Sequence, residues 1–175
     1  MEDEKDLDGL NAVYRNTVYM SYDAIVSAGE DGRVVLFNPA AMNMFGYTET
    51  EALDMNVEAF MPEEYRERHH VGMEYFLKTG KGPLIGKVSA VEGLKKDGSR
   101  FPADLSLSAE RIGGAWVFTA VIRDVTSRLA LEKDIKDRLL EMERLNRLMV
   151  GRELKMEELR QEIRELREKI DKAGL

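Results

Sequence analysis

Two adjacent histidines, His69 and His70, have the side chains in this sequence best suited to metal chemistry. They are the only histidines among the 175 residues. A neutral imidazole binds iron and other metal ions well, so either residue could be a metal or haem ligand. The alternative is a structural histidine that caps a helix, forms a hydrogen bond or faces solvent. The pair is poorly placed to activate one nucleophile together, because neighbouring residues of a helix point about 100° apart.

The composition excludes several other kinds of chemistry. The chain has no cysteine, which excludes disulfides, thiolate catalysis, zinc–thiolate sites and cysteinyl-flavin photochemistry. The glycine-rich segments 29–32 and 80–87 lack the spacing of a phosphate-binding loop. Carboxylates are scattered among caps and surface helices, and no hydrolytic constellation is present. The sequence therefore predicts that this chain is not an enzyme.

Charge and hydropathy limit the kinds of partner that the chain could bind and the cell compartment in which we expect it. The net charge of -7 argues against a nucleic-acid partner, because no broad face would neutralise phosphates. No run of residues approaches the eighteen apolar positions of a membrane segment, and the acidic residues 1–8 do not resemble a signal peptide. We therefore expect a cytoplasmic protein with no membrane segment.

The first half of the chain is predicted to be a helix, a hairpin and a series of short helices. Apolar residues at three- and four-residue steps (Leu7, Leu10, Tyr14) predict a helix over 2–22. The stripe is narrow and suits pairing with a second helix, although a partly ordered leader is the alternative. The other predicted elements are strands at 24–28 and 33–37, a helix capped by Asn38 and ended by Gly46, a capping box at Thr48–Glu51, and a helix over 63–79 that carries both histidines.

The sequence of the second half of the chain predicts three more strands, so the fold is expected to combine helices and strands. The strands are expected over 83–94, 101–111 and 115–123, separated by glycine-containing turns. Together with the first two strands they make a five-stranded antiparallel sheet with short helices on one face. The fold class is α+β.

The last strand runs almost directly into a long helix. No Gly or Pro separates the alternating residues 115–123 from the helical pattern that follows, and Asp124 and Thr126 are both good N-cap residues. A strand joined this closely to a helix couples the two mechanically. We therefore expect Arg123, Asp124, Val125 and Thr126 to relay a signal from the sheet to the helix.

The residues after Arg128 follow a seven-residue repeat that predicts a coiled coil. Arg138 and Arg152 interrupt one row of it. Ile at one core position and Leu at the other, as in the last two heptads, favour a parallel dimer. The predicted seam consists of Leu131, Ile135, Met142, Leu145, Met149, Met156, Leu159, Ile163, Leu166 and Ile170.

The middle of this seam is weak. Gly151 lowers helix propensity by roughly 1 kcal/mol relative to Ala, and three methionines pack softly. Apolar residues off the seam, such as Leu139 and Leu148, could define a second register. A firm end joined to a loose middle is typical of a switchable linker, and an imperfect coil without a switching role is the alternative.

Three segments together resemble a PAS domain. They are DGRVVLFNPAAMNMFGYTETEAL (31–53), KKDGSRFPADLSLS (95–108) and FTAVIRDVTSR (118–128), whose Asp124-Val125-Thr126 resembles the exit motif of that family. The resemblance implies a pocket between sheet and helices and a dimeric sensing module. It divides the chain into an N-terminal dimerisation helix (1–21), a PAS domain (22–126) and a coiled-coil signalling helix (127–175).

Residues 144–163 resemble the linker between PAS domains and the catalytic core of sensor histidine kinases. A downstream effector or kinase core is therefore the expected partner, alongside a second copy of the chain. No HATPase-like glycine-rich motif is present, and no phospho-accepting histidine follows the coil. We therefore expect that this chain is not itself a kinase.

The segment MPEEYRERHHVGMEYFLKTG (61–80) is similar to the corresponding helix of oxygen-sensing haem-PAS kinases. The resemblance places His69 on the proximal ligand of a b-type haem. It also places Ser89 on the distal arginine, Tyr75 on a propionate-binding arginine and Pro83 on a polar distal residue of that subfamily. Without the distal arginine we expect weaker discrimination for oxygen, so that CO, NO or a redox change would be the better signal.

The PAS resemblance implies a pocket and, through its haem-binding branch, a set of haem contacts, and it leads to three functional hypotheses. The expected apolar lining is Ile25, Leu36, Phe45, Phe60, Leu84, Ile85, Val117 and Val121, and the expected haem contacts are His69, Tyr75, Leu84, Ile85, Ser89, Val117 and Val121. The main hypothesis is a homodimeric sensory module that relays a pocket or interface change into the coiled coil. The alternatives are a haem-based gas or redox sensor, and a constitutive oligomerisation adaptor with an empty pocket.

Overall fold

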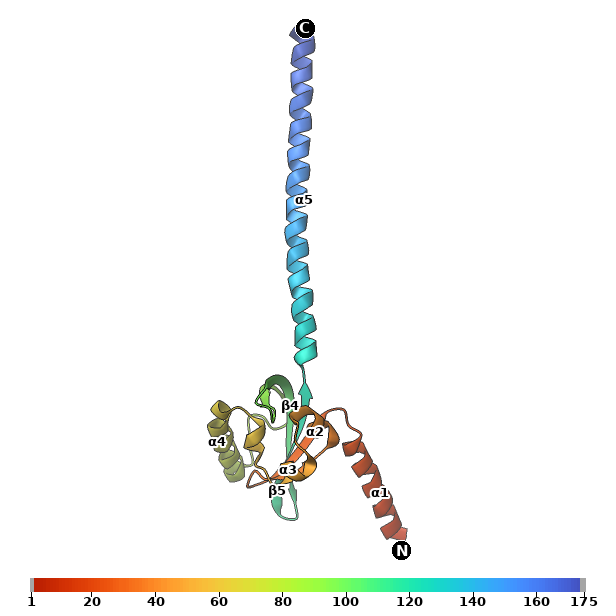
Figure 1. Cartoon of the computed structure of the whole chain (residues 1–175), viewed down its shortest axis with the longest axis vertical. Coiled ribbons are helices and arrows are strands. Elements are labelled where there is room, and N and C mark those ends of the chain that lie inside the picture. The colour runs from red at the N-terminus through yellow and green to blue at the C-terminus, as the bar shows by residue number, and fades with distance from the viewer. Residues whose placement is uncertain (1, 174–175) are drawn as a thin grey trace. The chain divides into compact units, whose positions relative to one another are not determined.

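The computed structural model describes the backbone of residues 2–173 and the side chains of residue 9, residues 11–167 and residue 169. The chain divides into two compact units, Met1–Ser127 and Arg128–Leu175. Its elements in chain order are α1 (Glu2–Tyr19), β1 (Ala24–Gly29), β2 (Val34–Phe37), α2 (Pro39–Phe45), α3 (Glu49–Leu53), the 3-10 helix η1 (Val57–Phe60), α4 (Glu63–Thr79), β3 (Val88–Leu94), β4 (Arg100–Ile112), β5 (Ala115–Asp124) and α5 (Thr126–Ala173) (Figure 1).

The five strands form one antiparallel sheet in the order β2-β1-β5-β4-β3. The last strand in sequence, β5, is therefore the central strand and pairs with β1 on one side and β4 on the other. A displacement of β5 would disturb both neighbours, since each shares a ladder of hydrogen bonds with it. The predicted α+β class and the five-stranded sheet with helices on one face are confirmed.

Local capping signals explain where the short helices begin and end. The Asn38 side chain accepts a hydrogen bond from the Ala41 N–H at the start of α2, where Pro39 occupies the first turn. Thr48 and Glu51 form the predicted capping box of α3. Gly80 ends α4 with a φ of 67°, a conformation that costs glycine little because it has no Cβ. These expectations are confirmed.

Two predicted boundaries are wrong. The strand expected over 83–94 begins only at Val88. The residues before it form turns, in which Pro83 has no N–H to donate and Gly86 adopts a φ of 73°. The N-terminal helix ends at Tyr19 rather than at Tyr22. The side chains of Leu7 and Leu10, on which its narrow stripe depends, lie outside those the structure describes.

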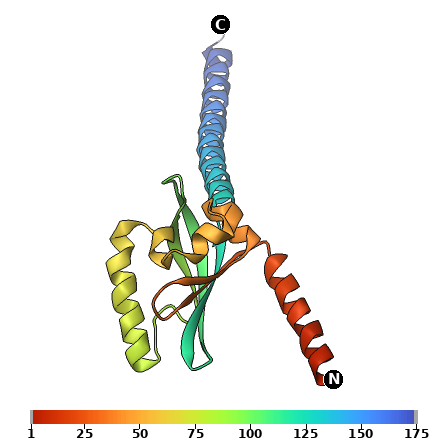
Figure 2. The same ribbon diagram turned by 60° about the horizontal axis from the view of Figure 1, so that its bottom comes forward.

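The core of the first unit lies between the sheet and its helices. Strand register puts Ala24, Val26, Phe118 and Ile122 on one face, which we call the inner face, because Val26 and Ala24 belong to the main core cluster. Four phenylalanines pack in that core, with ring centroids of Phe45 and Phe60 5.1 Å apart. They are Phe37, Phe45, Phe60 and Phe101. Helix α4 runs alongside the same sheet (Figure 2).

The second unit is a single long helix. Helix α5 is 48 residues long, and its described side chains within residues 128–169 are all exposed. Nine predicted seam residues, from Met142 at 67% to Leu159 at 42% exposed, therefore have no apolar cover within the described chain, and the side chain of Ile170 lies outside the described residues. None of the described helices combines the length and apolar character that a membrane-spanning segment requires.

Candidate functional site

Helix α4 presents one stripe of side chains toward the rest of the domain. The residues Arg66, His69, Gly72, Met73 and Phe76 are the less exposed ones of this helix, and they recur at three- and four-residue steps. We call this stripe the inward face of α4. His69 lies in its middle, with 29% of its side chain exposed, whereas the His70 side chain is 66% exposed. Only His69 therefore faces the interior.

Aromatic contacts hold α4 over the inner face of the sheet at its two ends. At its C-terminal end, Phe76 packs edge-to-face on Trp116 and Phe118, with ring centroids 5.0 and 5.1 Å apart. Its N-terminal end follows Phe60, whose ring belongs to the phenylalanine core. The middle of α4, with Arg66 and His69, therefore lies between two aromatic clusters.

The sheet residues between those clusters are only partly covered. Strand register places Ser89, Leu105, Leu107 and Ala120 on the inner face, and each remains partly exposed. We call these four residues the central strip. Partial exposure of Leu105 and Leu107 on the side covered by helices indicates that α4 is not packed down on them. The central strip is therefore the candidate ligand surface.

His69 is oriented by a carboxylate of η1. Its Nδ1 lies 3.5 Å from Oε1 of Glu58, which is at the outer limit of a hydrogen bond. Contact of Nδ1 with a carboxylate favours the tautomer in which Nε2 is free to bind a metal. A depression of about 210 Å³ adjoins the histidines, lined by Glu30, Asp31, Gly32, Asn56, Glu58, His69, His70, Met73, Glu74 and Leu77.

The side chains around His69 suit a metal ion whose other ligands are supplied by a cofactor. Among the described residues, no three His, Cys, Asp or Glu side chains are arranged so as to hold a metal ion. A bare cation would therefore find too few protein ligands here. The iron of a haem needs only one axial imidazole from the protein, which His69 could supply, and the apolar side chains of the central strip are chemically suited to contact a porphyrin.

The other predicted contacts do not all meet at this surface. Ser89 belongs to the central strip, and Ile85 is bridged to Leu107. Tyr75 and Leu84 are 53% and 37% exposed. Val117 and Val121 lie on the opposite face of β5 from Phe118, as their register with Gly29 and Ile25 requires. Of the expected apolar lining, Phe45 and Phe60 are in the core, whereas Ile25 and Leu36 share the outer face with Val121.

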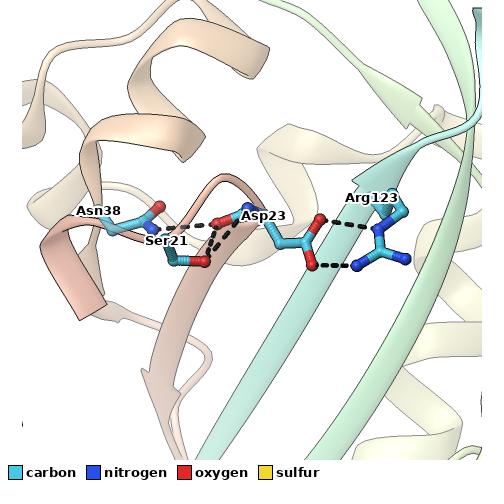
Figure 3. A network of polar contacts seen from close by, with 4 residues as sticks. All are labelled: Ser21, Asp23, Asn38 and Arg123. Atoms are coloured by element: carbon cyan, nitrogen blue, oxygen red, sulfur yellow. Dashed lines mark hydrogen bonds and ion pairs between the residues drawn. The ribbon is translucent and has the colours of Figure 1, made fainter. Parts of the chain in front are cut away.

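An ion pair joins the beginning of β1 to the end of β5. Nε and Nη2 of Arg123 donate to the two carboxylate oxygens of Asp23 at 2.9 and 2.6 Å (Figure 3). The hydrogen bond from Arg123 lowers the pKa of the Asp23 carboxyl. The pair therefore stabilises the fold above the usual carboxyl range, and this contribution is lost as the pH falls through the lowered pKa. Because the Arg123 side chain is 68% exposed, solvent screens the pair and its contribution to stability is small.

A buried asparagine connects the same region to α1. Asn38 has no exposed surface, and its amide Nδ2 donates to the carbonyl oxygens of Val18 and Asp23. Its Oδ1 accepts from the N–H groups of Ile25 and Ala41. Figure 3 shows Asn38, Ser21 and Asp23 as one polar network that continues to Arg123. One side chain thus ties the end of α1, the start of β1 and the start of α2.

The joint between β5 and α5 is a single residue. Val125 is 5% exposed, and its N–H donates to the carbonyl oxygen of Pro102. The Asp124 carboxylate accepts a hydrogen bond from the Thr126 N–H at 2.8 Å, which satisfies one free donor at the start of α5. The joint is therefore anchored to β4 and has no flexible spacer.

These features match a known family over most of the first unit. Residues 23–127 match the model of the PAS domain. The chain belongs to the PAS domain family. The resemblance inferred from the residues is confirmed, and the sheet order, the inward face of α4 and the β5–α5 joint are features of this PAS domain.

Two relatives extend the similarity beyond the PAS domain. An uncharacterized protein of Azorhizobium caulinodans is 37% identical over 150 residues, which are 81% of this chain and 20% of the relative. The sensor protein FixL of Bradyrhizobium diazoefficiens is 30% identical over 152 residues, which are 85% of this chain and 30% of the relative. The chain thus spans less than a third of the length of either protein.

A solved structure supports the fold. The PAS domain of an HTR-like protein from Haloarcula marismortui superposes with a TM-score of 0.56 at 23% identity, covering 70% of this chain and 98% of that one. At this identity the likeness concerns the fold alone. The family match and this fold together make the chain a PAS domain followed by a long helix.

Proposed function

We propose that this chain is a cytoplasmic, homodimeric sensory module that passes a conformational signal to a downstream effector, such as a kinase core. A change at the central strip or at the dimer interface moves β5. The Asp124-Val125-Thr126 joint passes that movement to α5, which forms a parallel coiled coil with its copy. The chain itself performs no catalysis in this proposal.

The proposal rests chiefly on the one-residue joint between β5 and α5. β5 is the central strand and α5 begins two residues after its last residue, Asp124. Because Val125 is buried and hydrogen-bonded to β4, a shift of β5 cannot be absorbed by a loop. We propose residues 1–21, 22–126 and 127–175 as the dimerisation helix, the sensory domain and the signalling helix. The break between the compact units at Ser127 supports the last boundary.

The relay can be tested with cysteine reporters, because the chain has no cysteine of its own. Single cysteines at Met142, Leu145 and Met149 report the register of the coil through their rates of intersubunit disulfide formation. Arg123→Gln is expected to change the ratio of these rates by about twofold or more, because it frees the end of β5 from Asp23. Inserting two glycines between Asp124 and Val125 is expected to remove the response.

Arg33→Gln is the matched control, since Arg33 is an exposed arginine near the edge strand β2 with a weaker contact of 3.7 Å to Asp31. It should leave the disulfide rates unchanged. A folded Arg123→Gln dimer whose rates equal those of the parent would contradict the relay. That result would favour the constitutive oligomerisation adaptor, in which the coil is indifferent to the state of the PAS domain.

A haem-based gas or redox sensor is the second candidate, and the position of His69 favours it. His69 is the imidazole on the inward face of α4, its Nδ1 lies near Glu58, and the apolar residues of the central strip lie on the opposing inner face of the sheet. His69 would hold the iron, and the central strip would pack on the porphyrin. A bound haem would supply a metal centre for a diatomic gas or a one-electron change.

Visible absorption after incubation with hemin tests this candidate. We expect a sharp Soret band in the parent and in His70→Ala, and loss of most of that band in His69→Ala. His70 is the matched control, since its side chain is exposed and contacts Glu74 on the same helix. A featureless spectrum, or a band that survives in His69→Ala, would exclude His69 as a haem ligand while leaving the relay proposal intact.

A further inference from the structure

One arginine on the inward face of α4 lacks a partner. The Nε of Arg66 is buried and has no hydrogen-bond partner. Among the described residues, no other buried side-chain nitrogen or oxygen lacks a partner. A guanidinium stays protonated in proteins, so this donor cannot be neutralised by losing a proton. An unmet buried donor on a charged group is costly. A group that completes it would therefore bind favourably.

The nearest carboxylates along the chain are engaged elsewhere or exposed. Glu64 binds Arg100 through both carboxylate oxygens, at 2.5 and 3.2 Å. Glu58 lies against Nδ1 of His69. Glu63 and Glu67 are exposed and lie off the inward face. The acceptor that would complete Arg66 therefore has to come from outside the described chain.

The surroundings of Arg66 define what that acceptor would belong to. Arg66 lies three residues before His69, on the face of α4 that lies over the inner side of the sheet. The inner face carries the apolar Leu105, Leu107 and Ala120 of the central strip. A ligand that bound there would bury an apolar body on the strip and would present a polar group to the helix.

The charges along α4 favour an anion at the Arg66 end. Glu58, Glu30, Asp31 and Glu74 line the depression beside His69, so a negative group would be repelled there. Arg66 is the permanent cation of the inward face, and it lies in the first half of α4, where the helix dipole also favours negative charge. Charge-assisted hydrogen bonds to a carboxylate or sulfonate are stronger than those to a neutral acceptor.

We propose that Arg66 is the anion-recognition residue of this PAS domain, and that its ligand is an organic anion with an apolar body. This inference rests on the proposed sensory function in one respect, which is that the central strip is the surface that binds the ligand. Arg66 binds the anionic group through its guanidinium, and the strip binds the apolar part. Either a free organic acid or a propionate of haem has this chemistry.

Two fluorescent probes with the same apolar body separate the two contributions. Anilinonaphthalene sulfonate carries an anionic group, and phenyl-naphthylamine lacks it. Trp116 is the only tryptophan of the chain and packs on Phe76 of α4, so energy transfer from it reports a probe bound near this helix. The parent is expected to bind both probes. Arg66→Gln is expected to weaken the affinity for the sulfonate probe by about tenfold or more. The affinity for the neutral probe should stay within about twofold of the parent's value.

Arg68→Gln is the matched control, because Arg68 is an exposed arginine of the same helix. It should change neither affinity, and Arg66→Lys should restore part of the sulfonate affinity by returning the charge. Equal sulfonate affinity in Arg66→Gln and the parent would overturn the inference, as would an equal loss for both probes. Failure of both probes to bind the parent would also remove the central strip as the ligand surface. When the parent binds the sulfonate probe, competition by octanoate or by hemin tells the two sources of the anion apart.

Discussion

Replacing Ile163 and Leu166 with lysine is expected to separate the protein into monomers. Both side chains are 51% exposed in the single chain, on a helix whose described side chains after Ser127 have no apolar cover of their own. In a parallel coiled coil they would be core residues of two consecutive seam layers. Burying such a side chain contributes roughly 1.5–3 kcal/mol, and a dimer would lose four of them. Dissociation should therefore become easier by at least about 100-fold, measured by sedimentation equilibrium.

The control places lysine off the seam, at Gln161 and Glu165, whose side chains share a 3.5 Å hydrogen bond on the same helix. This variant gains at least as much positive charge but should remain dimeric. A parent that is monomeric at tens of micromolar would contradict the homodimer proposal itself. A cysteine at Ile163 checks the orientation, because only a parallel dimer in register brings the two copies of that residue within disulfide reach.

Replacing Asn38 with alanine is expected to destabilise the PAS domain by about 3 kcal/mol. The change removes the cap of α2 and leaves the partly buried Ile25 N–H without its side-chain acceptor. It also removes the donor to the carbonyl oxygens of Val18 and Asp23. Loss of a cap costs about 1 kcal/mol, and each buried group left unsatisfied costs about 1–3 kcal/mol. Urea unfolding followed by circular dichroism measures the difference in the free energy of unfolding.

Asn43→Ala is the control for this prediction, because Asn43 is an exposed asparagine of the same helix. Its effect should stay within about 0.5 kcal/mol. Asn38→Asp keeps the oxygen that caps α2 but cannot donate to Val18 and Asp23, so it should fall between the parent and Asn38→Ala. A loss below about 1 kcal/mol for Asn38→Ala would mean that water replaces this network at little cost.

The local structure of this PAS domain follows from short-range chemistry that can be read in the sequence. Asn38-Pro39 begins α2, Thr48 and Glu51 cap α3, and Gly80 ends α4. Each signal acts within a few residues, through a side chain that satisfies the backbone of its own helix. The same holds for the step from β5 to α5, since Asp124 binds the Thr126 N–H beside it.

Such short-range signals do not show which face of the sheet the helices cover. The alternation along β5 separates Trp116, Phe118, Ala120 and Ile122 from Val117 and Val121, yet both sets contain apolar residues. Residue type therefore did not reveal which set the helices cover. The pairing of Val26 with Ala120 and the packing of Phe76 on Phe118 decide it, and they leave Val117 and Val121 on the other face. The predicted pocket lining was divided between the two faces for this reason.

The family, the order of strands and helices, the strand-to-helix joint and the apolar repeat of α5 could all be predicted from the residues. These depend on periodicity and on neighbours within a few residues, where the chain has little freedom. The three-dimensional packing, in contrast, was needed to show that Arg123 pairs with Asp23, 100 residues away, that Glu58 lies beside His69, and that Nε of Arg66 has no hydrogen-bond partner. Such contacts depend on which distant elements the packed core brings together. A small change in the distance between donor and acceptor then decides whether a polar group forms a hydrogen bond within the chain.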